Sequence, residues 1–137
     1  MAYKGYLLKV GDFEILAEKY IQASSYSVLY SVTDIDSYRN ANGELIRTAL
    51  THRVPKIEFS TVTNMSNIEF ADFMSNIRRN YVIPEERKVQ VDCYIPEIDN
   101  YITTFAYMPD ITPKINRIDE NKNIIYYDAI RIAFIGY

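Results

Sequence analysis

The chain has 137 residues, of which 48 % are hydrophobic and 24 % charged, and its net charge is −3. These values are typical of one globular domain, residues 1–137, and they argue against long disordered stretches and against a basic surface for sequence-specific nucleic-acid binding. The single cysteine excludes an intrachain disulfide, and no apolar stretch approaches the roughly 18 residues of a membrane span. Because MAYKGYLLKV contains no apolar signal core, we expect a protein made in the cytoplasm.

Tyrosine is unusually frequent, with 13 Tyr against 6 Phe and no Trp. Tyrosine favours strands, so this count first indicates a β-rich protein. The same side chain combines a large apolar ring with a hydroxyl group and is enriched in subunit interfaces, which adds an interface as a second interpretation.

The N-terminal part predicts strands. Residues 4–10 and 13–16 flank Gly11-Asp12, as in a short hairpin. The stretch 12–23 fits both strand and helical spacing, and we favour a strand that runs into a loop. In 26–32, apolar side chains alternate with polar ones, which predicts a half-buried antiparallel strand.

A polar segment of about twenty residues, DIDSYRNANGELIRTALTHR, separates this strand from the next one at 54–62. Loops of such length are uncommon in compact domains. Asn42-Gly43 predicts a hairpin turn, and the apolar residues around it alternate with balanced charges. We therefore predict a protruding hairpin arm at about 33–53 that contacts other subunits; the alternative is a loop folded back on its own sheet. The predicted interface residues are Tyr38, Arg39, Asn42, Gly43, Leu45, Ile46, Arg47 and Leu50.

One helix is predicted at about 66–80. Ser66 and Glu69 form a capping box, and Phe70, Phe73, Met74 and Ile77 make one apolar stripe. Arg78 and Arg79 lie in the last turn, where the negative end of the helix dipole stabilises positive charge. The stripe is typical of a helix that packs on a sheet; a binding groove is the alternative.

The C-terminal part again predicts strands, at 88–96, 101–108, 112–118 and 123–137, the last continuous to the final residue. About eight antiparallel strands with one packed helix predict a mainly β fold, a small β-barrel or sandwich.

The sequence offers little for catalysis or for cofactor binding. Cys93 lies on the apolar face of its predicted strand, and His52 is the only histidine; both are expected to be dispensable for function. The acidic stretches at 34–36 and 119–123 do not match the calcium-loop pattern, and four scattered glycines cannot form a phosphate loop. We therefore predict no catalytic, cofactor-binding or metal-binding residues and no enzymatic activity.

Four segments carry a resemblance that spans nearly the whole chain: MAYKGYLLKVG at the start, DIDSYRNANGELIRTAL in the arm, NIEF at 67–70 and YDAIRIAFIGY at the end. On these segments the sequence resembles an uncharacterised family of short phage and prophage proteins encoded among tail genes of bacteria related to clostridia. More distantly, the layout is similar to phage tail-tube-like proteins, in which a β-barrel or sandwich carries one flanking helix and a long hairpin arm.

The resemblance implies a structural virion protein of a bacteriophage tail, made in the host cytoplasm. It implies a homo-oligomer, a hexameric ring in the tail tube or at the tube–baseplate (hub) junction, whose arms contact neighbouring subunits and other tail or baseplate proteins. The alternatives are a head–tail completion protein and a monomeric β-barrel module that binds a ligand or a protein.

Overall fold

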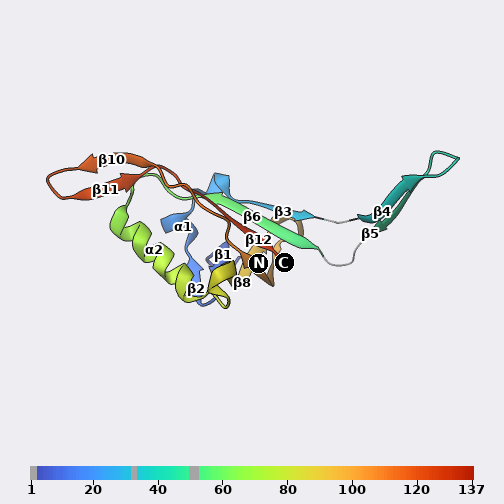
Figure 1. Cartoon of the computed structure of the whole chain (residues 1–137), viewed down its shortest axis with the longest axis horizontal. Coiled ribbons are helices and arrows are strands. Elements are labelled where there is room, and N and C mark those ends of the chain that lie inside the picture. The colour runs from blue at the N-terminus through green and yellow to red at the C-terminus, as the bar shows by residue number, and fades with distance from the viewer. Residues whose placement is uncertain (1–2, 32–33, 50–52) are drawn as a thin grey trace.

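Antiparallel strands are the predominant elements in the computed structural model, which describes residues 3–31, 34–49 and 53–137 (Figure 1). The strands in the first half are β1 (Leu8–Val10), β2 (Phe13–Ile15), β3 (Ser27–Ser31), β4 (Asp34–Arg39), β5 (Leu45–Ala49), β6 (Val54–Ser60) and β7 (Met65–Ser66). Those in the second half are β8 (Lys88–Ile95), β9 (Asn100–Tyr107), β10 (Ile115–Asp119), β11 (Ile124–Tyr127) and β12 (Arg131–Gly136). The helices are α1 (Ala17–Tyr20) and α2 (Asn67–Arg79), with 3-10 turns η1 (Ala23–Ser25), η2 (Pro84–Glu86) and η3 (Pro96–Ile98). The predicted mainly β fold with one principal helix is confirmed.

Among the described residues the strands form three antiparallel sheets. Seven strands pair in the order β2-β1-β8-β9-β12-β6-β3, three in the order β10-β11-β7, and β4 pairs with β5 alone. The large sheet is open, because its end strands β2 and β3 do not pair with each other in the described residues. A closed barrel is therefore not formed, and α2 packs below the large sheet as in a sandwich (Figure 1).

Tyr26 spans the inside of this curved sheet. It lies just before β3, at one end of the strand order, and its hydroxyl donates to the carbonyl oxygens of Leu7 (3.2 Å) and Tyr94 (2.8 Å) near β1 and β8. Burial raises the pKa of Tyr26 above its usual value. The side chain thus links the two halves of the sheet where backbone pairing does not.

The core follows the alternation expected of half-buried strands. Along β8 the side chains of Val89, Val91, Cys93 and Ile95 are all buried. The intervening side chains of β8 lie on the outer face of the sheet. The position predicted for Cys93, on the apolar face of a strand, is confirmed.

The buried Cys93 thiol predicts a pH dependence of stability. Burial, with a smaller effect of Asp92, raises the pKa of Cys93 to about 12, above the ordinary value of about 8.5. Only the unfolded thiol ionises between these values, so the unfolded state binds fewer protons and stability falls as the pH rises through this interval. Above pH 9, the free energy of unfolding of the wild type should fall with rising pH. For each pH unit it should fall by about 1 kcal/mol more than that of the Cys93→Ala protein. Urea titrations of both proteins between pH 7 and 10.5 measure this difference; parallel profiles would contradict it.

The start of α2 agrees with the predicted cap. Ser66 is the N-cap residue, and its Oγ accepts a hydrogen bond of 3.2 Å from the backbone N–H of Glu69. Phe73, Met74 and Ile77 are buried and Phe70 is half-buried, so the apolar stripe packs inward as predicted.

Loss of this cap is expected to destabilise the protein. Ser66→Ala leaves the N–H of Glu69 without its acceptor and should lower the free energy of unfolding by about 0.5–2 kcal/mol, measured by urea denaturation. Ser75→Ala, an exposed position within the same helix, is the matched control and should not destabilise. Equal effects of the two substitutions would contradict the role of the cap.

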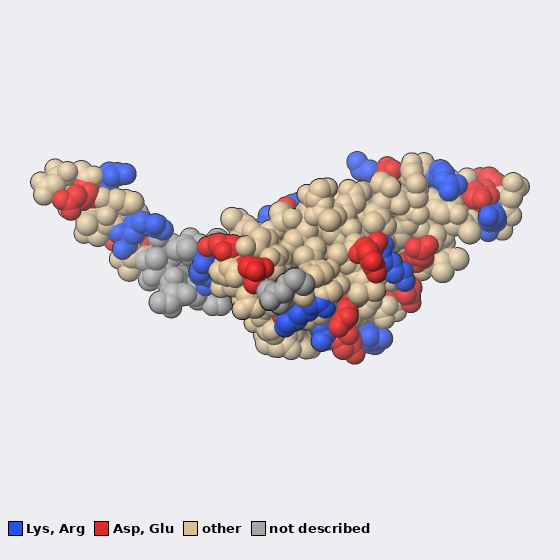
Figure 2. All heavy atoms as spheres, turned by 180° about the vertical axis from the view of Figure 1, so that it is seen from behind, with Lys and Arg blue, Asp and Glu red and all other residues tan. Residues whose placement is uncertain are grey.

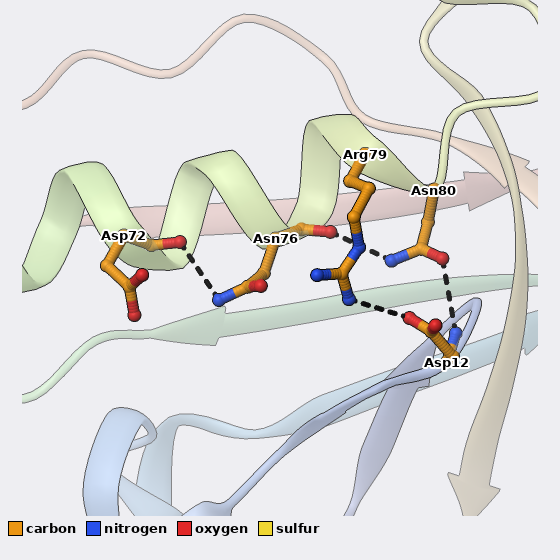
Figure 3. Close-up of polar contacts among 5 residues, drawn as sticks. All are labelled: Asp12, Asp72, Asn76, Arg79 and Asn80. Carbon is orange, nitrogen blue, oxygen red and sulfur yellow. Dashed lines mark hydrogen bonds and ion pairs between the residues drawn. The ribbon is translucent and has the colours of Figure 1, made fainter.

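The end of α2 is fastened to the β1–β2 turn (Figure 3). Arg79 donates to the Asp12 carboxylate at 2.9 Å, and the backbone N–H of Asp12 donates to Asn80 Oδ1 at 3.3 Å. Gly11 has φ +61°, and a Cβ there would lie 2.3 Å from Asn80 Oδ1, so this close approach requires glycine. Hydrogen bonds from Arg79 and Asn80 lower the pKa of Asp12.

Two predictions for secondary structure need correction. The segment 123–137 is not one strand: β11 joins the three-stranded sheet and β12 the seven-stranded one. A continuous strand of 15 residues would reach ~50 Å, too long for a small sheet, and the chain breaks at 128–130, where the N–H of Ile130 donates to the buried Thr61 hydroxyl. In 12–23 the strand β2 leads into the helical turn α1 rather than a loop, because the N–H groups of Tyr20 and Ile21 donate to the carbonyl oxygens four residues earlier. These breaks and the short added strands raise the strand number above the predicted eight.

Candidate subunit interface

The predicted arm is a two-stranded hairpin, β4–β5, that projects beyond one end of the large sheet (Figure 1). Its strands pair Asp36 with Thr48, Ser37 with Arg47, Tyr38 with Ile46 and Arg39 with Leu45. A bulge between Asp34 and Asp36 lies near its base. The second hairpin, β10–β11, extends from the opposite end of the molecule (Figure 1).

The tip of the arm is organised by Asn40. Its side-chain Oδ1 accepts hydrogen bonds from the N–H groups of Asn42 and Glu44, both at 3.0 Å. The backbone of Asn40 pairs with Glu44, which leaves a three-residue loop with Gly43 at φ +82°. Asn42-Gly43 therefore marks the turn as predicted, but within a three-residue loop, in which glycine occupies the left-handed position.

The side chains of the arm are open to solvent. All described side chains from 36 to 48 are exposed except that of Asn40, which is half-buried. The exposed fractions are 55 % for Tyr38, 48 % for Leu45 and 37 % for Ile46. These side chains do not pack on the protein's own sheet, unlike the folded-back loop that was the alternative.

Strand pairing sorts the charges of the arm onto two faces. Because neighbouring residues of a strand point to opposite sides, Asp36, Tyr38, Glu44 and Ile46 share one face, here called the acidic face. Arg39, Leu45 and Arg47 share the other, the basic face. Two carboxylates give the first face a charge of −2, and two guanidinium groups give the second +2. Both signs are visible along the arm (Figure 2).

The acidic face has an apolar centre. The Tyr38–Ile46 pair lies in the middle row, with Asp36 in the row toward the body and Glu44 in the row toward the tip. Exposed aromatic side chains of this kind often dominate the binding energy of an interface, and flanking charges set its register.

Arg53, just before β6, joins β3 to η3 within the body. Its guanidinium group stacks on the Tyr30 ring at 3.8 Å, donates to the carbonyl oxygen of Tyr30 at 2.5 Å, and forms an ion pair of 3.0 Å with Glu97. Planar stacking and several donors at once are properties of arginine that lysine lacks.

Several tyrosines pack and form hydrogen bonds within the body of the protein. Tyr101 packs edge-on against Tyr6 and Tyr94, with ring centroids 5.4 and 5.5 Å apart. The Tyr6 hydroxyl donates to Asp92 at 3.0 Å, and burial together with this bond raises the pKa of Tyr6 to about 12. These contacts support the β-sheet interpretation of the tyrosine count, whereas Tyr38 remains available for an interface.

The predicted interface residues fall into three groups. The structure brings Tyr38 together with Ile46, places Arg39, Leu45 and Arg47 on the opposite face, and puts Asn42 and Gly43 at the tip. Leu50 and His52 lie outside the described residues. Sequence analysis missed Asn40 and Arg53: an Asn at the first position of a turn is a recognisable signal, but the contact of Arg53 with Tyr30 depends on the pairing of β3 with β6.

No group of three or more His, Cys, Asp or Glu side chains suited to a metal ion occurs in the part of the chain that the structure describes. Within the same residues, no helix is long and apolar enough to cross a membrane.

Comparison with curated proteins and with solved structures finds no match. The family model of DUF6711, described as a family of unknown function, matches residues 1–137, the full length of the chain. The chain therefore belongs to the DUF6711 family.

Proposed function

We propose that this protein is a structural subunit of a bacteriophage tail, in the tail tube or at the tube–baseplate junction. It acts in the virion as a homo-oligomeric, hexameric ring and has no enzymatic role. The β4–β5 arm makes the contacts with neighbouring subunits.

The observation that carries this proposal is the exposed, two-faced arm. This hairpin exposes Tyr38, Leu45 and Ile46 and carries −2 and +2 charges on opposite faces, a pattern that a passive connecting loop does not need. Apolar centres with charged surroundings are typical of protein–protein interfaces. The resemblance of the sequence to phage tail-region proteins supports the choice of assembly.

The shape of the molecule favours contacts of the head-to-tail kind. The arm lies at one end, and α2 with the β10–β11 hairpin lies toward the other (Figure 1). A contact between unlike surfaces of identical subunits closes into a ring when the rotation between them allows it.

Two measurements test the proposal. Sedimentation velocity and native mass spectrometry of the purified chain should show a concentration-dependent ring, and antibody labelling of purified tail particles should place the chain on the tail in electron micrographs. A chain that stays monomeric at every concentration and is absent from the particles would support the alternative, a monomeric binding module.

A further inference from the structure

An apolar groove lies on the body along one side of α2. Its lining residues are Phe70, Met74, Arg78, Tyr81, Arg87, Met108 and Ile111. Phe70, Met74 and Arg78 are spaced by four residues, so they form one stripe along the helix, and the chain segments around Tyr81 and Met108 form the opposite side. The volume of the groove is about 300 Å³.

The groove suits an aromatic or aliphatic anchor. Met74 and Met108 are almost fully buried and form its floor, and Phe70, Tyr81 and Ile111 are half-buried around it. Methionine side chains are flexible and polarizable, so such a floor adapts to an inserted side chain.

The charged side chains that line the groove itself are both arginines, Arg78 and Arg87. Arg78 forms no ion pair with any residue in 3–31, 34–49 or 53–137, and Arg87 also lines the groove. Arg87 forms an ion pair of 2.7 Å with Asp110, a carboxylate that is 91 % exposed beside the groove. The side chains of Arg78, Arg87 and Asp110 together carry a charge of +1. Arg78 is the one of the two arginines that has no ion-pair partner among the described residues.

We propose that this groove receives the acidic face of the arm of a second copy of the chain. The Tyr38–Ile46 pair enters the groove over Met74 and Met108, and one of the flanking carboxylates, Asp36 or Glu44, pairs with Arg78. The inference rests on the proposed function and names the receiving surface for its arm.

Three observations select this occupant. The acidic face offers apolar side chains between carboxylates, and the groove offers apolar walls with an open guanidinium group, so both charge and polarity match. The basic face of the arm would place Arg39 and Arg47 against Arg78. The arm projects from the end of the molecule away from α2, which makes this a contact between copies and gives it the head-to-tail character of a ring (Figure 1).

Charge reversal and its rescue test the contact in the full chain. Arg78→Glu should weaken self-association by about tenfold or more in sedimentation velocity, because it turns attraction into repulsion. Arg78→Glu combined with either Asp36→Arg or Glu44→Arg should restore association, and the combination that does so fixes the direction of the arm in the groove. Lys122→Glu is the control: it makes a cation-to-carboxylate change at an exposed position outside the groove and should leave association unchanged.

Circular dichroism confirms that each variant is folded, and Tyr81→Ala gives a second variant that changes the groove without changing charge; it should also weaken association. If Arg78→Glu and Tyr81→Ala both associate normally, or if neither arm substitution rescues Arg78→Glu, this docking site is wrong. When removal of the arm nevertheless abolishes association, the arm binds elsewhere and the proposed function survives. When removal of the arm has no effect, the proposed function fails as well.

Discussion

Replacement of residues 36–48 by a short glycine-containing turn is expected to give a folded monomer that no longer assembles. The replaced side chains are exposed apart from Asn40, whose side-chain hydrogen bonds lie within the arm, so the core loses nothing with them. The length of a surface loop changes the closure entropy only slowly, and the free energy of unfolding should change by less than ~1 kcal/mol. Association should be lost at every subunit, because each copy contributes one arm. Sedimentation velocity gives the association state, and urea denaturation gives the stability.

Leu29→Ser provides the control for a loss of exposed apolar surface. Leu29 lies on β3 and is 63 % exposed, slightly more than Tyr38 at 55 %, but it belongs to the body. The Leu29→Ser protein should therefore assemble like the wild type. An arm-replaced protein that fails to fold would place the arm in the core, and one that folds and assembles normally would make it a passive loop.

Local patterns in the sequence are sufficient to predict the principal helix and strands. The alternation of Val89, Val91, Cys93 and Ile95 predicted their common buried face, and the Ser66 cap with its apolar stripe predicted α2 within one or two residues. The arm was predicted because its polar length and its turn signal are both local properties.

Features that depend on pairing could not be predicted in this way. The two charged faces of the arm follow from the register that places Tyr38 opposite Ile46, and the composition of the segment shows only that its charges balance. The groove brings Met74, Tyr81 and Met108 together from three separate segments. The division of 123–137 between two sheets likewise depends on Thr61, a residue more than sixty positions away from its partner Ile130.

The second large effect is expected in the core, where Phe73→Ala should lower the free energy of unfolding by about 3–5 kcal/mol. Phe73 is fully buried, and its ring centroid lies 5.0 Å from that of Tyr20 and 5.9 Å from that of Phe13. Truncation removes buried apolar area and leaves a cavity between α2 and the β2–α1 segment, which the surrounding rings fill only in part. Urea denaturation of both proteins measures the loss.

Phe105→Ala is the matched control, since Phe105 lies on β9 with 42 % of its surface exposed and should cost less than ~1 kcal/mol. If Phe73→Ala cost no more than Phe105→Ala, α2 would not be packed on the core in the way described. The position of α2 also determines the groove, because Phe70 stacks on Phe73 with centroids 6.3 Å apart. A destabilised but still folded Phe73→Ala protein should therefore associate more weakly than Phe105→Ala at equal concentration, which connects the packing of the helix with the assembly of the subunits.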